Sequence, residues 1–221
     1  MPFSRHADVM TINTEDLLSS IMESLDRIVY IKPEDIPNID LYMDQVTTFM
    51  ESRLKSATRN PEEDKILTKT MINNYAKNDL LPPPVKKKYS KDHVLLLIFI
   101  FYYKGILSIS DIQELLKPIT DRYFDAPEDS FYNLEKIYET VLEREKAQTD
   151  NLKEDILHKF QMSEKTFTDA PDDSREFLQI FSFICMLSFD VYIKRLLIEK
   201  IIDLFHVPQG KDKTDQKNQK N

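Results

Sequence analysis

Glycine is almost absent from this chain, which has 2 glycines among 221 residues. The two, Gly105 and Gly210, lie too far apart in sequence to share one loop. Phosphate-binding loops and dinucleotide-binding turns need several clustered glycines, so both kinds of nucleotide site are excluded. Cysteine is equally scarce, because Cys185 stands alone. A single cysteine forms neither an internal disulfide nor a thiolate metal site, which fits a reducing cytoplasm.

Catalytic and metal-binding motifs are missing as well. The four histidines are scattered and form no paired helical motif. No nucleophile has a base near it in sequence, and no two carboxylates have a recognisable spacing. We therefore expect no catalytic residues, no cofactor and no metal, and the chain is not expected to be an enzyme. Cys185 lies within FSFICMLSF and is expected to be a small buried apolar residue.

Long uninterrupted hydrophobic runs are also lacking. The N-terminus has no basic start followed by an apolar stretch, so it does not resemble a secretory signal. The longest apolar runs, at 94–103 and, with interruptions, at 177–189, are shorter than the roughly 20 residues that span a bilayer. Hydrophobic residues nevertheless make up 41% of the chain, which suffices for a folded core. We expect a globular cytoplasmic protein without a membrane partner.

Positive charge is concentrated in one segment of an acidic chain. The formal net charge is -8, yet residues 65–91 hold seven lysines against the single acidic residue Asp79, a net charge of +6. We call this segment the basic island. Acidic surface elsewhere would repel DNA, so a nucleic acid could dock only at this island.

Apolar residues recur at helical spacing along most of the chain, which predicts an all-α fold. The helix at 90–103 contains HVLLLIFIFYY and should be buried on most sides. A short helix beginning at Ser108 or Ser110 should end at Pro118. Other helices are expected at 14–30, 41–54, 68–78, 131–160 and 175–205, and a small hairpin around 82–89 is the only strand structure expected.

The helix expected at 68–78 has one polar and one apolar face. On a helical wheel its polar side chains fall within an arc of about 140°: Lys69, Thr70, Asn73, Asn74 and Lys77. Asparagine amides can pair with adenine edges, threonine methyls can contact thymine, and lysine can reach guanine or phosphate. The stiff LLPPP segment then leads to residues suited to phosphate contact, namely Lys86, Lys87, Lys88 and Lys91 around Tyr89.

The order LTKTMINNYAKNDLLPPP, followed by KKKYSKDHVLLLIFIFYYKGILSISDIQELL, resembles the winged helix-turn-helix of the MerR family of bacterial transcription regulators. Over about residues 39–116 the chain is also similar to an uncharacterised bacterial domain family of unknown function, a divergent relative of that family. The resemblance implies that 39–120 is a DNA-binding domain. The polar residues of the helix at 68–78 would form its recognition face, and residues 86–89 its wing. It also implies dimerisation through a helix that follows this domain.

These observations predict a homodimeric transcription regulator that binds a pseudo-palindromic site on double-stranded DNA. Residues 1–38 would add an N-terminal helix on the core, 130–206 a helical dimerisation or effector region, and 207–221 a disordered tail. In the C-terminal region several side chains would either line a pocket for an apolar effector or form core: Phe177, Phe181, Phe183, Met186, Phe189 and Tyr192. The alternative is a helical protein-interaction module whose basic face docks an acidic partner.

Overall fold

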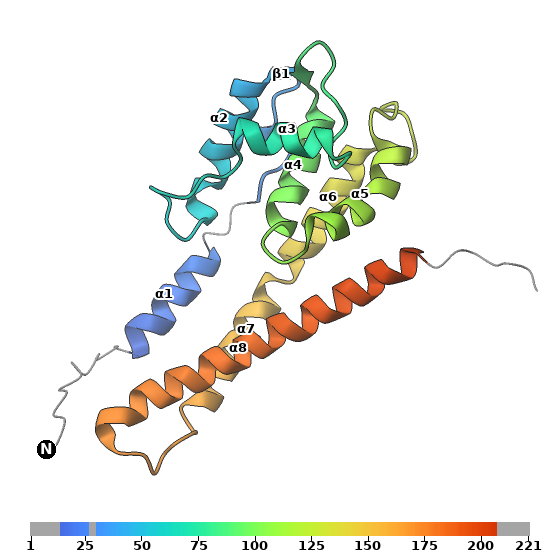
Figure 1. Ribbon diagram of the computed structural model, residues 1–221. Coiled ribbons are helices and arrows are strands. Elements are labelled where there is room, and N and C mark those ends of the chain that lie inside the picture. The colour runs from blue at the N-terminus through green and yellow to red at the C-terminus, as the bar shows by residue number, and fades with distance from the viewer. Residues whose placement is uncertain (1–13, 27–29, 207–221) are drawn as a thin grey trace, which may run out of the picture.

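A computed structural model describes residues 14–26 and 30–206 and confirms the all-α class. The disordered tail expected at 207–221 lies outside the described residues. The elements (Figure 1) are the helices α1 (Thr14–Asp26), α2 (Met43–Leu54), α3 (Lys69–Lys77), α4 (Lys91–Tyr103), α5 (Ile109–Tyr123), α6 (Leu134–Ala147), α7 (Thr149–Ser163) and α8 (Asp172–Asp203), the 3-10 turns Pro33–Asp35, Lys55–Ala57 and Leu204–His206, and the strands β1 (Leu41–Tyr42) and β2 (Lys88–Tyr89).

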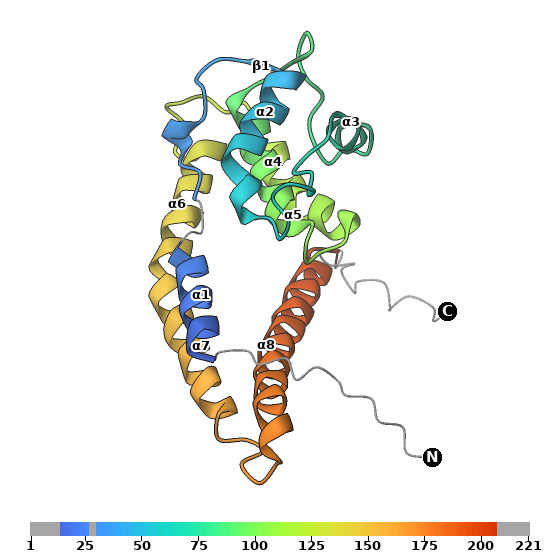
Figure 2. The same ribbon diagram turned by 90° about the vertical axis from the view of Figure 1, so that its left-hand side faces the viewer.

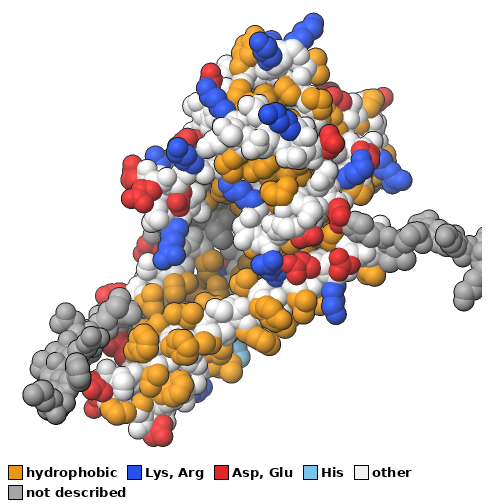
Figure 3. Space-filling view, viewed as in Figure 1, with side chains coloured by type: hydrophobic (Ala, Val, Ile, Leu, Met, Phe, Trp, Pro, Cys, Tyr) orange, Lys and Arg blue, Asp and Glu red, His pale blue; other side chains and the backbone are white. Residues whose placement is uncertain are grey.

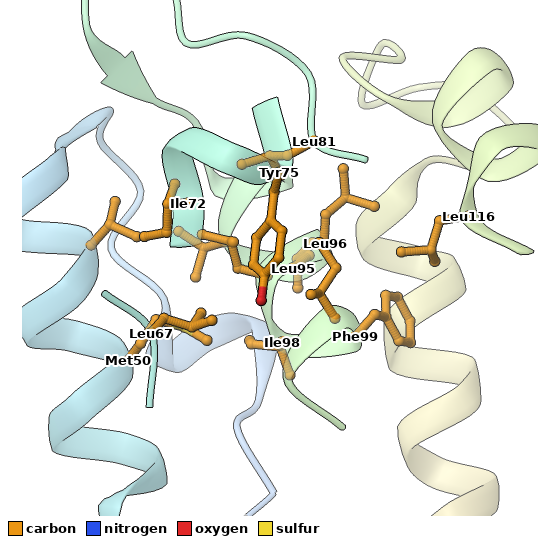
Figure 4. Packing of buried hydrophobic residues seen from close by; sticks show 14 of the residues in the cluster. Met50, Leu67, Ile72, Tyr75, Leu81, Leu95, Leu96, Ile98, Phe99 and Leu116 are labelled. Atoms are coloured by element: carbon orange, nitrogen blue, oxygen red, sulfur yellow. The ribbon is translucent and has the colours of Figure 1, made fainter. Parts of the chain in front are cut away.

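Helix α4 is the centre of the core, as its apolar sequence predicts. Residues 94–100 are all buried, because α2, α3, α5 and α6 surround the helix. In Figure 4 the ring of Tyr75 reaches from α3 toward Leu95 and Leu96 of α4. We call the part formed by residues 31–147, from the first 3-10 turn to α6, the body.

Helices α7 and α8 form a second part, which we call the arm (residues 149–203). They pack against each other, and the C-terminal end of α8 returns to α5 (Figures 1 and 2). The N-terminal helix, expected to lie on the core, instead lies beside α7. The Tyr30 and Thr149 hydroxyls lie 3.1 Å apart at this junction, and Lys153 pairs with Asp26. The turn between α7 and α8 is the end of the arm farthest from the body, and α8 runs back from it to contact α5 (Figure 2).

Helix α5 corrects one expectation, because it does not end at Pro118. A proline within a helix removes one backbone hydrogen bond, yet α5 continues to Tyr123. The Thr120 hydroxyl donates to the Leu116 carbonyl at 3.0 Å, and Ile119 packs against the core. Packing of the last turn thus outweighs the missing bond, and the linker begins only at Phe124.

The single helix expected at 131–160 is wrong, because two helices stand there. Helix α6 begins only at Leu134, since the Asn133 side chain accepts from the Lys136 N–H at 2.9 Å and caps it. Phe131 lies outside the helix and is 87% exposed. The break falls at Gln148, inside a stretch of polar sequence that offers too few apolar contacts to hold one straight helix.

The aromatic residues of helix α8 were expected either to form core or to line a pocket for an apolar effector, and most of them are not buried. Ile180 and Phe183 are buried, whereas Phe177 and Phe189 are more than half exposed. Cys185, expected to be buried, is also exposed. The reason is that α7 covers only one side of α8, so an apolar sequence alone does not ensure burial.

Helix α8 is also long and apolar enough to cross a membrane, judged by length and composition, and one window of 18 residues has a mean hydropathy of 1.5. No segment long enough to cross a membrane was expected, because the longest apolar runs of the sequence are shorter than roughly 20 residues. The serines within the helix break the runs without making the segment polar.

Candidate nucleic-acid interface

Helix α3 is fixed by its first turn and its apolar side. The Thr68 hydroxyl accepts from the Met71 N–H at 3.2 Å, as expected of a capping residue. Ile72 and Tyr75 are buried in the body, and this anchors the helix. The opposite side is exposed along its whole length and holds the predicted set Lys69, Thr70, Asn73, Asn74 and Lys77. The structure thus presents the predicted polar face to solvent.

The end of α3 sets the direction of the chain that follows. Asp79 has a φ of 54°, a left-handed conformation that is usual at the residue after a helix. The N–H groups of Leu80 and Leu81 both donate to the Tyr75 carbonyl, at 2.9 and 3.2 Å. Both leucines are buried, so the segment that starts at Pro82 leaves α3 from a fixed point.

A tight hairpin at residues 85–88 forms the tip of the basic island. The backbones of Val85 and Lys88 exchange two hydrogen bonds, of 3.1 and 2.9 Å. Between them Lys86 and Lys87 have φ angles of 51° and 65°. Positive φ at both central residues defines a type I′ turn, where asparagine and glycine are the usual residues. Two lysines are thus held at the end of a two-residue turn.

The hairpin is tied to the start of the body by a short antiparallel pairing of β1 with β2. Leu41 pairs with Tyr89, and Tyr42 with Lys88. Leu41 was expected in a helix, but it lies in strand β1. The helix begins at Met43 because the Tyr42 N–H donates to the Gln45 side chain at 2.8 Å. A two-residue strand leaves no periodicity in a sequence from which it could be found.

The lysines of the island differ in their surroundings. Lys77, Lys86 and Lys87 are exposed and have no ion pair with a described residue. Lys69 pairs with Asp44 of α2, and the Lys88 ammonium lies 5.3 Å from the centre of the Tyr42 ring. Lys and Arg side chains surround α3 and the hairpin in Figure 3, whereas hydrophobic side chains cover much of the arm.

Tyr89 and Lys91 face inward. Tyr89 is 2% exposed, and its ring lies edge-on to His93 with 5.4 Å between the ring centres. The Lys91 ammonium lies 2.7 Å from a carboxylate oxygen of Glu135 on α6. Both side chains therefore pack or pair within the body, where the sequence analysis had counted them among the DNA contacts.

His93 holds the hairpin to α4, a role that the sequence did not suggest. Its Nδ1 accepts from the Ser90 N–H at 2.9 Å, so this nitrogen carries no proton. The ring is buried between Tyr89 and Phe124, with 4.8 Å between its centre and that of Phe124. Burial lowers the pKa of His93 from its ordinary value. Its position three residues after the capping serine was the one available signal.

Within residues 14–26 and 30–206, no three His, Cys, Asp or Glu side chains are grouped so that they could hold a metal ion. A small cavity in the body is lined by Tyr30, Tyr102, Tyr138 and Glu145, among others, and its 20 Å³ has room for about one water molecule. The Tyr138 hydroxyl donates to the Ile31 carbonyl at 2.7 Å beside it. The exposed polar surface of the basic island remains the strongest candidate site.

Comparison with protein families gives one match, over residues 31–141, to a family described as a domain of unknown function (DUF1836). The matched segment is half of the chain. It begins where the body begins, ends within α6, and includes the whole basic island. No curated protein and no solved structure matches the chain.

Proposed function

We propose that this chain, which belongs to the DUF1836 family, is a transcription regulator that binds double-stranded DNA through its basic island. In the proposed arrangement, which follows the resemblance to a MerR-like winged helix-turn-helix, α3 lies in the major groove and the hairpin at 85–88 contacts phosphates. The protein acts in the cytoplasm as a homodimer. The observation that carries the proposal is the turn that holds Lys86 and Lys87.

That turn is costly to form. A residue other than glycine with positive φ costs on the order of 1 kcal/mol, and lysine has no short side chain to relieve the strain. Lys86 and Lys87 both adopt this conformation, and both are exposed without an ion pair among the described residues. Strained backbone persists where the surrounding fold enforces it, and it is concentrated at functional sites. The turn fixes the backbone positions of the two lysines, and their ammonium groups can reach the phosphates of a duplex.

Helix α3 supplies the groups that would distinguish bases. The side-chain amides of Asn73 and Asn74 form no hydrogen bond with a described residue, and the Thr70 side chain lies on the same exposed face. Free amides can bond adenine in the major groove. Because the fixed end of α3 leads directly to the hairpin, base-reading and phosphate-binding groups lie next to each other.

A second candidate is a protein-interaction module, and the composition of the island favours it. The island holds no arginine, the residue that most often reads guanine in DNA. The exposed lysines Lys77, Lys86 and Lys87 would equally suit an acidic protein surface.

The test is fluorescence anisotropy of the purified chain with pooled fragments of its own genome, including its upstream region, at several salt concentrations. We expect selective binding that weakens with salt and is lost in Lys86→Glu/Lys87→Glu. The matched control is Lys165→Glu/Lys200→Glu, which changes the charge equally at two exposed lysines outside the island and should bind as wild type.

In the same assay Asn73→Ala should relax base preference by about 1–3 kcal/mol. Lys87→Gln should weaken all sequences alike and lower the salt slope by about one contact per subunit. Binding that both double variants retain would contradict the proposal. Nuclease-resistant capture of a protein, lost only in the Lys86→Glu/Lys87→Glu variant, would instead select the interaction module.

A further inference from the structure

One side of α8 is apolar and open to solvent. On the other side, Ile180 and Phe183 pack against α7, and Phe183 lies edge-on to Phe160 with 5.4 Å between ring centres. The open side holds six apolar residues that are each more than half exposed: Phe177, Phe181, Ile184, Phe189, Val191 and Tyr192. We call these six residues the apolar face of α8.

The apolar face has the spacing of a helix that pairs with another helix. Its six residues fall within an arc of about 160° on a helical wheel. Phe177, Phe181, Ile184 and Val191 follow one another by steps of four, three and seven residues, the repeat typical of coiled coils. Residues 177–189 contain no charged side chain at all. Glu176 and Asp190 flank this stretch, and Asp190 points toward α7 and lies 2.8 Å from Lys159.

The size of the face fits a protein interface. A large apolar side chain that is half exposed leaves on the order of 100 Å² in water, so the six residues offer roughly 600 Å². Cys185, Ser188 and Leu196 lie between and beside them, and they bring the area near the roughly 800 Å² per partner of a stable interface. The largest apolar patch of an ordinary monomer is usually no larger than about 600 Å².

A membrane does not fit this surface, although α8 is long enough to cross one. If α8 spanned a bilayer, α7 packed along it would carry Lys153, Asp155 and Lys159 into the hydrocarbon. Each charge costs about 3 kcal/mol there. A helix lying on a membrane surface carries Lys and Arg along its polar side, whereas residues 176–193 have neither. The cover that fits is therefore another protein surface.

We propose that the apolar face of α8 pairs with the same face of a second copy and forms the homodimer interface. The six residues carry no charge, and Arg195, which follows them on the same side of α8, is paired with Glu199 at 2.8 Å. The face can therefore meet itself about a two-fold axis without strong repulsion between like charges. The choice of a second copy rests on the proposed function, because a pseudo-palindromic site needs two recognition helices. The arm extends away from the basic island, so pairing leaves both islands open to DNA (Figure 1).

The proposed interface lies within the region expected at 130–206, on α8 and not on α6, the first helix after the predicted DNA-binding domain. The apolar residues of α6, such as Leu134, Tyr138 and Leu142, are buried in the body and cannot also pair with a partner. The apolar side of α6, which forms the first part of the helix expected at 131–160, is therefore not available to a second copy while the body is folded. Helix α8 is the element whose apolar side remains uncovered.

The test is sedimentation velocity of the full chain without DNA. We expect wild type at twice the monomer mass of 26.1 kDa. Phe189→Glu should raise the dissociation constant by at least about a hundredfold, because each dimer would bury two unpaired charges. The matched control is Phe131→Glu, the same change at an exposed phenylalanine outside the arm, which should leave the constant unchanged. Both residues are exposed in one protomer, so circular dichroism should remain that of wild type.

Cys185, the only cysteine, gives a second readout. It lies beside the apolar face, so a short bismaleimide should link two wild-type chains and should fail to link Phe189→Glu. A monomeric wild type, or a dimer that Phe189→Glu leaves intact, would overturn the inference. So would flotation of wild type, but not of Phe189→Glu, with anionic lipid vesicles, since that identifies a membrane as the cover.

The two proposals can fail separately. Lys86→Glu/Lys87→Glu should remain dimeric while losing DNA, and Phe189→Glu should keep a weaker, single-site affinity for DNA while losing the dimer. A dimer that binds no DNA contradicts only the proposed function. A monomer that binds DNA contradicts only the interface on α8.

Discussion

Helix α4 of the body and helix α8 of the arm both contain long apolar stretches, but α4 is buried and α8 is largely exposed. The stretches are HVLLLIFIFYY in α4 and FLQIFSFICMLSF in α8. Residues 94–100 of α4 are all buried, whereas in α8 only Ile180, Phe183 and Ile202 are. An apolar helix thus indicates that a surface must be covered, but it does not indicate what covers it.

The difference comes from the neighbours that each helix meets. Around α4 the chain folds α2, α3, α5 and α6, each with an apolar side that points inward. Helix α8 follows α7, which is largely polar and contributes mainly Phe160 and Ser163 as buried residues. The body therefore completes its own core, whereas one side of α8 remains uncovered by the described residues.

The largest expected effect comes from removing one large side chain from α4 and one from α8 and comparing the changes in the free energy of unfolding. Leu96→Ala removes a side chain that is 0% exposed and should lower the free energy of unfolding by about 2–5 kcal/mol. Phe189→Ala removes one that is 64% exposed and should change it by less than about 0.5 kcal/mol in dilute, monomeric protein. Urea denaturation followed by circular dichroism measures both.

Protein concentration makes this comparison sharper. At concentrations that favour the dimer, wild type should gain stability that Phe189→Ala lacks, because only the folded protomer pairs. Leu96→Ala should lose the same free energy at every concentration. Equal losses for the two variants in dilute protein would contradict the division into a self-sufficient body and a dependent arm.

Low pH should affect the stability of the body more than that of the arm, because the buried His93 lies in the body. The Nδ1 of His93 accepts the Ser90 N–H, and burial lowers the pKa of the ring from its ordinary value of 6.5. Below pH 6.5 the unfolded chain therefore binds a proton that the folded body does not. Stability is complete above this pH and falls below it, by at most about 1.4 kcal/mol per pH unit.

His93→Gln isolates this effect. Glutamine is a common residue at this position of a helix start and can accept the same Ser90 N–H, but it does not titrate. We expect the variant to lose the fall in stability just below pH 6.5, measured by urea denaturation at several pH values. All other groups should titrate alike in wild type and in His93→Gln. If the free energy of unfolding depended on pH identically in the two proteins, His93 would take up a proton as readily in the folded state as in the unfolded state.

Much of the body could be predicted from sequence, because its signals are local. Thr68 and Ser90 begin α3 and α4 as expected, and helical spacing placed the polar face of α3 correctly. Wherever distant packing decides the outcome, local signals failed. Helix α5 continues past Pro118 because Ile119 packs against the core, and Tyr89 pairs with Leu41 of β1, which is distant in sequence. The hairpin expected around 82–89 is present, but the positive φ angles of Lys86 and Lys87 and the exposed side of α8 could not be foreseen, since neither has a characteristic sequence.

The smallest expected effect tests whether the turn is kept for function. Lys86→Asn/Lys87→Gly introduces the residues that a type I′ turn prefers and should raise the free energy of unfolding by about 1 kcal/mol. The same change removes two exposed lysines, so DNA affinity should fall and the salt slope should shrink by about two contacts per subunit. The arm is untouched, and the dimer should persist.

The matched control is Asp125→Gly, which relieves a φ of 53° in the loop after α5. It should raise stability by a similar amount, again about 1 kcal/mol, and leave DNA binding unchanged, because Asp125 lies outside the basic island. A hairpin variant that is more stable and binds DNA as well as wild type would show that the two lysines are not held there for phosphate. If Lys86→Asn/Lys87→Gly were less stable than wild type, the two lysines would not be strained in this turn. Their positive φ angles would then give no support to a functional role.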